Sequence, residues 1–262
     1  MDMEPQMNAK EGDWTQEIDT ACVQGPNEAG IPPDAGLLLL GLIEALQRPL
    51  FPEETQPVQG AIEKRYREFC AGRTLAREAL RRLGTDGRQR IPATDDRTPA
   101  WPAGFTGAIT HTHGFCGCAV ARTEAVRAVG IDMETCGRVK PNLWSRIFTE
   151  EEQKALLDLA DDQRDVIATA MFCAKESYYK LQYGLTRTWL NFVDVSVLPG
   201  APGQLTIVAA AGTHAAAAVP RLEGYYSVPF PDTVLCQCWL MNPPTQPVSR
   251  QWTAPGRRAG SG

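Results

Sequence analysis

The chain has 262 residues, 43% of them hydrophobic, which is enough for one large domain or two small ones with a substantial core. Its formal net charge of −5 gives no indication of nucleic-acid binding. Eight cysteines occur in a chain of this length without a C-x-x-C pair, which excludes a disulfide-dense mini-protein and favours reduced thiols. The apolar run at 37–40 is too short to span a bilayer and no signal peptide is apparent, so we expect a cytoplasmic protein without membrane contact.

Order is expected between residues 36 and 242. Residues 1–35 mix acidic, Gln, Gly and Pro residues without periodicity and are predicted to be disordered, as is the Pro-, Gly- and Arg-rich tail at 243–262. Hydrophobic periodicity and turn residues predict the following elements. Strands are expected at 36–43, 107–110, 115–122, 126–134, 191–197, 204–209, 225–228 and 233–241, and helices at 61–83, 139–147, from 150 onward and at 166–182, the last ending at Gly184.

The helix at 61–83 has the clearest apolar stripe and many arginines, most of which are expected on a solvated face. Gly72 and Arg73 stand out, because a glycine inside a helix allows a ligand or another backbone to approach closely.

Two carboxylates lie two residues apart in the apolar hexapeptide at 129–134. In a strand, Asp132 and Glu134 fall on one face, and Ile131 and Met133 on the other. Like charges on one face repel each other, and a bound Mg²⁺ would remove that repulsion. The alternative is a pair of solvated acids on an edge strand.

Two C-x-C pairs, Cys116/Cys118 and Cys236/Cys238, fall in predicted strands. Four thiols could hold zinc, but this spacing is unusual for a zinc site, so we interpret them as small buried residues.

Further acids and lysines follow in later helices. Glu152 lies three residues after Thr149 in a capping-box pattern, which by itself explains its presence. Glu176 and Lys180 are spaced as a helical ion pair. Together with the acids of the strand, they match the requirements of Mg²⁺-dependent phosphoryl transfer. The chain has neither a P-loop nor a strand-linked G-x-G-x-x-G motif, so basic side chains would have to hold a nucleotide. It has no G-x-S-x-G motif either, so a Ser/His/Asp hydrolase is unsupported.

Several motifs resemble those of the 4′-phosphopantetheinyl transferases and follow the same order along the chain. The resemblance is greatest to the monomeric enterobactin synthetase component D and surfactin type. The two strongest are Gly-Ile-Asp-Met-Glu at 130–134 and Phe-Cys-Ala-Lys-Glu-Ser-Tyr-Tyr-Lys at 172–180. The other matching segments are 51–54, 67–80, 97–102, 109–111 and 148–152. The resemblance covers roughly residues 36–240 and departs from the family at Cys173, where a serine is usual.

The resemblance implies an α+β fold of two similar subdomains, expected at 36–128 and 129–242, with the active site in the cleft between them. It implies that a serine of an acyl or peptidyl carrier protein attacks the β-phosphate of coenzyme A, and that 3′,5′-ADP leaves. Asp132, Glu134 and Glu176 would bind Mg²⁺, with Mn²⁺ as an alternative. Glu152 would be the general base for the serine, and Lys180 would neutralise the phosphates.

The resemblance further implies that Arg73, Arg97 and His111 hold the nucleotide, with Lys175 near the phosphates. His113 is an alternative to His111, and Lys175 could instead be a solvated helix charge. A monomer that serves polyketide, nonribosomal peptide or fatty acid carriers is expected. A Mg²⁺-dependent nucleotide phosphohydrolase and an inactive carrier-binding module remain as alternatives.

Overall fold

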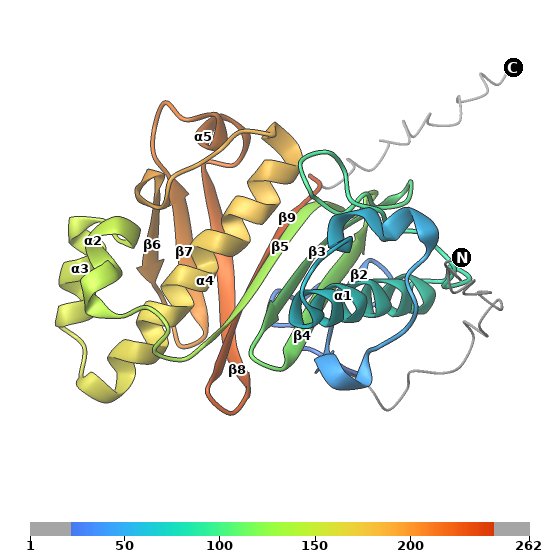
Figure 1. Cartoon of the computed structure of the whole chain (residues 1–262). Coiled ribbons are helices and arrows are strands. Elements are labelled where there is room, and N and C mark those ends of the chain that lie inside the picture. The colour runs from blue at the N-terminus through green and yellow to red at the C-terminus, as the bar shows by residue number, and fades with distance from the viewer. Residues whose placement is uncertain (1–21, 244–262) are drawn as a thin grey trace, which may run out of the picture.

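The computed structural model describes residues 22–243, which form two antiparallel sheets, each packed against one long helix (Figure 1). The first sheet has the order β1-β2-β4-β3 and the second the order β5-β9-β8-β7-β6. The first half comprises β1 (Cys22–Gln24), β2 (Gly36–Leu42), α1 (Glu63–Arg82), β3 (Phe105–Thr112) and β4 (Phe115–Arg122). The second comprises β5 (Val126–Thr135), α2 (Trp144–Ile147), α3 (Glu150–Leu157), α4 (Asp161–Thr186), β6 (Val195–Pro199), β7 (Gln204–Ala209), α5 (His214–Ala218), β8 (Arg221–Phe230) and β9 (Thr233–Met241).

Three hydrophobic clusters hold these layers together. One lies between α1 and the first sheet, and another between α4 and the second sheet. The third contains residues of both sheets, such as Leu40, Ile131 and Trp239, on the faces turned away from the helices. Alternate residues of β2 and of β5 therefore belong to different hydrophobic clusters, because successive side chains of a strand point to opposite faces of the sheet. The expected α+β fold of two sheet-and-helix halves is confirmed, while the boundary at 128/129 stays a prediction.

The segment 22–35 departs from the prediction that residues 1–35 are mostly disordered. Strand β1 pairs antiparallel with β2, and both Ile31 and Ala35 are buried. The Asn27 side chain bonds both the N–H and the C=O of Ile31, each at 2.8 Å. The partner of β1 lies in β2, so the local composition of this segment does not reveal the pairing. Residues 1–21 and 244–262 lie outside the described part of the chain.

Two predicted element boundaries were also wrong. Helix α4 continues through Gly184, where we expected it to end, as far as Thr186. Its C-cap residue, Arg187, has a left-handed φ of 53°. The expected helix at 139–147 is reduced to a 3-10 turn, Pro141–Leu143, followed by the single turn α2.

The cysteines of the two C-x-C pairs are buried in different sheets, in β4 and β9. Burial raises the pKa of Cys116 and of Cys236 to about 12, so these thiols are protonated at neutral pH. No cluster of ligand-type side chains that could hold a metal occurs within residues 22–243. The interpretation as small core residues fits these observations.

Candidate active site

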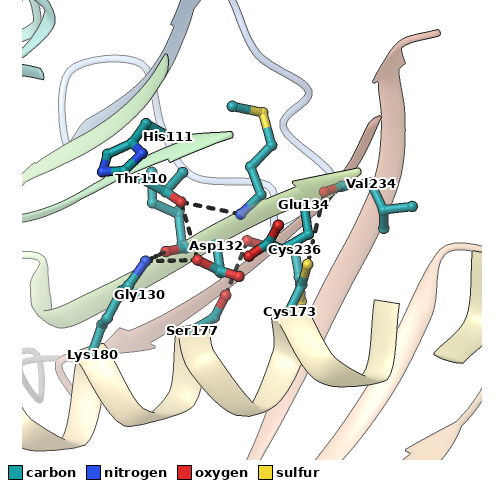
Figure 2. A network of polar contacts seen from close by, with 12 residues as sticks. Thr110, His111, Gly130, Asp132, Glu134, Cys173, Ser177, Lys180, Val234 and Cys236 are labelled. Atoms are coloured by element: carbon teal, nitrogen blue, oxygen red, sulfur yellow. Dashed lines mark hydrogen bonds and ion pairs between the residues drawn. The ribbon is translucent and has the colours of Figure 1, made fainter. Parts of the chain in front are cut away.

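The acids of β5 lie where the two halves meet, beside β3 and facing α4 (Figure 2). Ile131 and Met133 are fully buried in the shared cluster. Asp132, only 7% exposed, lies on the opposite face of the strand. The strand is an edge strand, as the alternative reading required, but Asp132 is not solvated.

Gly130 explains why α4 can lie against β5. A Cβ at this position would come within 1.9 Å of the carbonyl oxygen of Ser177, a backbone atom of α4. Only glycine allows the helix and the strand this close. The approach brings Lys180 to the strand, where its Nζ donates to Asp132 Oδ1 at 2.8 Å and to the Ile131 carbonyl at 3.0 Å.

Thr110 of β3 joins the two halves from the other side. Its hydroxyl donates to Asp132 Oδ1 at 3.0 Å and accepts from the Met133 N–H at 3.2 Å. Thr110 and Lys180 thus form hydrogen bonds with backbone groups at the unpaired edge of β5. Both side chains also donate to the same carboxylate oxygen, Asp132 Oδ1. Sequence reasoning missed this role, although Thr110 lies inside the matched segment at 109–111.

The other oxygen, Asp132 Oδ2, is buried and has no hydrogen-bond partner among the described residues. Burial, reinforced by the charge of Asp132, raises the pKa of Glu134 and also that of Glu176. The negative charges of Asp132, Glu134 and Glu176 therefore act on one another, and Lys180 and the exposed Arg138, 3.4 Å from Glu134, offset them only in part. An unpartnered oxygen in an acidic cluster fits a hard cation.

The acids do not form a complete metal cage, since no group of three ligand-type side chains converges closely enough within residues 22–243. Magnesium commonly takes one or two carboxylates and completes its shell with water and substrate phosphate oxygens. The arrangement suits a cation that arrives together with a phosphate ligand.

Cationic cavities flank the acids. The first, which we name the Arg97 cavity, has a volume of about 510 Å³ and is bordered by residues of both halves. Its chemistry-bearing lining consists of Arg97, Trp101, Arg127, Lys180, Tyr183 and Arg187. The second, the His111 cavity, has a volume of about 490 Å³. Its lining includes Lys64, Arg65, His111, His113, Glu134 and Arg138.

A smaller pocket of about 240 Å³, the Trp189 pocket, borders Glu176 on the other side. Its lining includes the aromatic residues Tyr179, Trp189 and Phe192. The Trp189 side chain is 74% exposed, which leaves a large apolar surface at the pocket mouth.

His111 lies in the second cavity between two charged residues of α1. Arg65 Nη1 is 3.1 Å from His111 Nε2, and Glu68 is 3.7 Å from Nδ1. Because arginine can only donate, Nε2 accepts and the proton resides on Nδ1. Burial lowers the pKa of His111, against the pull of Glu68. His111 and His113 line the same cavity, so the choice between them stays open.

Glu152 and Lys175 do not have the surroundings their predicted roles need. Both side chains are buried and form an ion pair of 2.7 Å. Glu152 also accepts from the N–H groups of Val197 and Thr149, and the capping box with Thr149 is present. Lys175 donates to the Ile147 carbonyl, to Glu152 and to the Phe192 carbonyl, which uses all three of its N–H bonds. Neither a general base nor a phosphate contact fits these positions.

Arg73 is likewise structural. It is 4% exposed, donates from Nε to the Ile91 carbonyl at 2.6 Å and stacks on Phe69 at 4.1 Å. Burial lowers its pKa to about 10. The neighbouring Gly72 makes room for Ile109 of β3, because a Cβ would come within 2.8 Å of that side chain. The close approach that we predicted at Gly72 thus serves helix–sheet packing.

The candidate site residues therefore fall into two groups. Those that the structure brings to the acids or to the cavities beside them are Asp132, Glu134, Glu176, Lys180, Arg97 and His111. Those fixed by partners in the interior are Arg73, Glu152 and Lys175, of which Lys175 also borders the Trp189 pocket.

Sequence comparisons match the chain over both halves. The model of the 4′-phosphopantetheinyl transferase N-terminal domain matches residues 53–121, and that of the 4′-phosphopantetheinyl transferase superfamily matches residues 128–226. The relative from Streptomyces mobaraensis, 4′-phosphopantetheinyl transferase Svp, is 38% identical over 56% of this chain and 60% of its own length.

Two further relatives agree. The 4′-phosphopantetheinyl transferase PptT of Mycobacterium tuberculosis is 35% identical over 56% of this chain and 63% of its own length. Enterobactin synthase component D of Salmonella typhi is 29% identical over 55% of each chain. The chain thus spans less than two thirds of these relatives, but both family models match it in order. The resemblance stated from the motifs is confirmed, and the chain belongs to the 4′-phosphopantetheinyl transferase superfamily.

Proposed function

We propose that this protein transfers the 4′-phosphopantetheine group of coenzyme A to a serine of an apo carrier protein. The observation that carries the proposal is the cluster of the buried Asp132 with the partly buried Glu134, Glu176 and Lys180, which lies between two cationic cavities. Such a cluster needs a cation to balance it, and the cationic cavities on either side suit the phosphates of a polyphosphate ligand.

Coenzyme A has the matching chemistry. Its pyrophosphate would lie at the acids and Lys180, with Mg²⁺, or alternatively Mn²⁺, held by Asp132, Glu134 and Glu176. The 3′-phosphoadenosine would occupy the cationic cavities, where Arg97 and His111 are available. The apolar lining of the Trp189 pocket suits the thiol-bearing arm. When bound, the cation would polarise the pyrophosphate and stabilise the leaving phosphate.

The chain's own residues supply position and charge. Lys180 compensates the charge of the pyrophosphate, and Thr110 and Gly130 fix the strand and the helix that carry the acids. The serine oxygen forms a bond to the β-phosphorus as its hydroxyl proton passes to solvent water, the bond to the bridging oxygen breaks, and 3′,5′-ADP leaves with the electron pair. Holding these groups in register can supply a large part of the rate enhancement.

The partners proposed are acyl or peptidyl carrier domains of polyketide, nonribosomal peptide or fatty acid synthesis, served by a monomeric cytoplasmic enzyme. The overall charge of −5 does not favour a nucleic-acid partner. No helix among residues 22–243 is long and apolar enough to cross a membrane.

Intact-mass spectrometry of apo carrier proteins tests the proposal. The carriers are incubated with the protein, coenzyme A and Mg²⁺, with an EDTA control and the Asp132→Asn variant. We expect a mass gain of one phosphopantetheine group that EDTA and the substitution abolish. Breakdown of coenzyme A without any carrier would establish the phosphohydrolase instead. Carrier binding with neither transfer nor breakdown would establish the inactive binding module.

A further inference from the structure

Two unusual backbone conformations occur at the rim of the Arg97 cavity. Within residues 22–243, three residues other than glycine have a positive φ, and two of them, Arg97 (64°) and Arg187 (53°), line this cavity. Left-handed backbone is unfavourable for residues with a side chain and persists where the surroundings enforce it. Arg97 comes from the first half of the molecule, and Arg187 caps α4 in the second.

An ion pair joins the two halves of the molecule at the rim of the Arg97 cavity. Arg187 Nη1 lies 3.0 Å from Asp96 Oδ2 and donates to Thr98 Oγ1, also at 3.0 Å. The same arginine lies over the Tyr183 ring, 5.8 Å from its centroid. The pair is partly exposed, with 54% of the Arg187 side chain and 31% of the Asp96 side chain accessible. We name this contact the Asp96–Arg187 latch.

The two oxygens of Asp96 have different tasks. Oδ1 organises the turn that carries Arg97, because it accepts from the hydroxyls of Thr94 and Thr98 and from the Thr98 N–H. Backbone bonds from the Thr94 N–H to the Thr98 carbonyl and from the Arg97 N–H to the Thr94 carbonyl close the turn. Oδ2 faces Arg187. An Asn at position 96 would keep the first set of contacts and lose the second.

The base of the same loop is fixed independently. Glu54, fully buried, accepts from the Ile91 N–H at 2.8 Å, and Arg73 donates to the Ile91 carbonyl at 2.6 Å. Arg77 holds Glu54 in place through two contacts of 2.8 and 2.9 Å. The loop is thus rigid at Ile91, and its tip at Arg97 is joined to α4 by the latch.

Helix α4 also carries Lys180, two turns before Arg187. The latch therefore fixes Arg97 relative to the helix that supplies Lys180 to the same cavity. Without the latch, the position of Arg97 would be set only by a turn that is attached to the first half of the molecule. Two cationic side chains bind a shared ligand less tightly when their relative position is not preorganised.

We propose that Asp96 and Arg187 are positioning residues, which latch the two halves together across the cavity and hold Arg97 for the phosphates of the nucleotide. This inference rests on the proposed function, because it assigns the cavity to the nucleotide of coenzyme A. Neither residue of the latch contacts the acids in the described structure, so the loss should fall on binding rather than on turnover.

Calorimetric titration of coenzyme A in Mg²⁺ tests the proposal with Arg187→Gln, Asp96→Asn and the double variant. We expect each single substitution to weaken binding by about twofold to fivefold, the range of an exposed ion pair. The double variant should lose no more than Arg187→Gln alone, because that substitution already removes the interaction with Asp96. The KM for coenzyme A should rise in parallel while kcat stays within about twofold. Arg187→Lys, which keeps the charge, should restore most of the binding.

Arg221→Gln is the matched control, since Arg221 forms an exposed ion pair with Glu223 of the same strand, β8, and does not line the cavity. A direct phosphate contact by Arg187 would overturn the proposal: Asp96→Asn would then bind as tightly as the wild type, while Arg187→Gln would not.

Hydrogen exchange of residues 94–99, without ligand, separates failure of the latch from failure of the proposed function. We expect faster exchange in both single variants. Exchange at wild-type rates would overturn the latch itself. Faster exchange in a protein whose wild type does not bind coenzyme A would confirm the contact between the halves but refute the assignment of the cavity, and with it the proposed function.

Discussion

The Glu152 carboxylate and the Lys175 ammonium lie 2.7 Å apart in the interior, where each is almost inaccessible to solvent. Both residues belong to motifs that led us to expect chemistry from them. The structure instead gives each a full set of hydrogen-bond partners and joins α3, α4 and β6 through them. Their contribution is to the stability of the second half.

Glu152→Gln should therefore unfold more easily. Removing one partner of a buried pair leaves the other charge uncompensated, which costs about 3–5 kcal/mol of the free energy of unfolding. Urea denaturation measures this, and the double variant with Lys175→Met should recover part of the loss. A Glu152→Gln protein of unchanged stability and strongly reduced turnover would restore the general-base role.

Glu176→Gln should show the opposite behaviour. Burial and Asp132 raise the pKa of Glu176, so the charged form is unfavourable in the protein without ligand, and the neutral amide should not lower the melting temperature. Turnover should fall by at least about a hundredfold, because an electrostatic contact made at the reacting phosphates is lost. Thermal melting and the carrier assay measure the two effects, with exposed Glu124→Gln as the control. A smaller loss of turnover than in folded Glu152→Gln would contradict the assignment.

Gly130→Ala should destabilise the protein and impair the site together. The added methyl group would meet the Ser177 carbonyl at 1.9 Å, and backbone cannot move aside as a side chain does. Overpacking of this kind costs about 1–3 kcal/mol or more, and the displaced α4 would carry Lys180 and Glu176 away from Asp132.

Gly184→Ala is the matched control for this substitution in denaturation experiments. It lies in α4 with open space around its Cα, so alanine should be neutral or stabilise by up to about 1 kcal/mol. Equal melting temperatures for the two variants would show that the contact of α4 with β5 is not tight.

His111 should make stability depend on pH. Its pKa is lowered in the folded protein by burial, so the unfolded chain takes up a proton first as the pH falls. The free energy of unfolding should therefore decline as the pH drops from about 6.5 through the lower folded pKa. His111→Gln should lose this part of the decline, as followed by chemical denaturation at a series of pH values. His113→Gln in the same cavity is the control, and parallel curves for wild type and His111→Gln would refute the effect.

The sequence by itself determined the family, most of the helices and strands in their order, and the facing of the acids, but not β1 or α5. Alternation along 129–134 put Asp132 and Glu134 on the face opposite Ile131 and Met133, because side-chain direction in a strand depends on local geometry alone. Helix α1 was predictable for the same reason, since its apolar stripe repeats at helical spacing. The motif order from Phe51 to Lys180 indicated the family before any fold was known.

Only the tertiary structure decided which charged residues are available to a ligand. Arg73, Glu152 and Lys175 have the same charges as Arg97, Glu176 and Lys180, and a helical or loop position does not tell the two groups apart. Burial and partner atoms do, and these come from segments far away along the chain, such as Ile91 for Arg73 and Val197 for Glu152. Thr110 and the Asp96–Arg187 latch became evident for the same reason, because each joins the two halves across more than 20 residues of sequence. Local pattern places a charge on an element, but the packing of that element against the rest of the protein decides whether the charge supports the fold or faces a substrate.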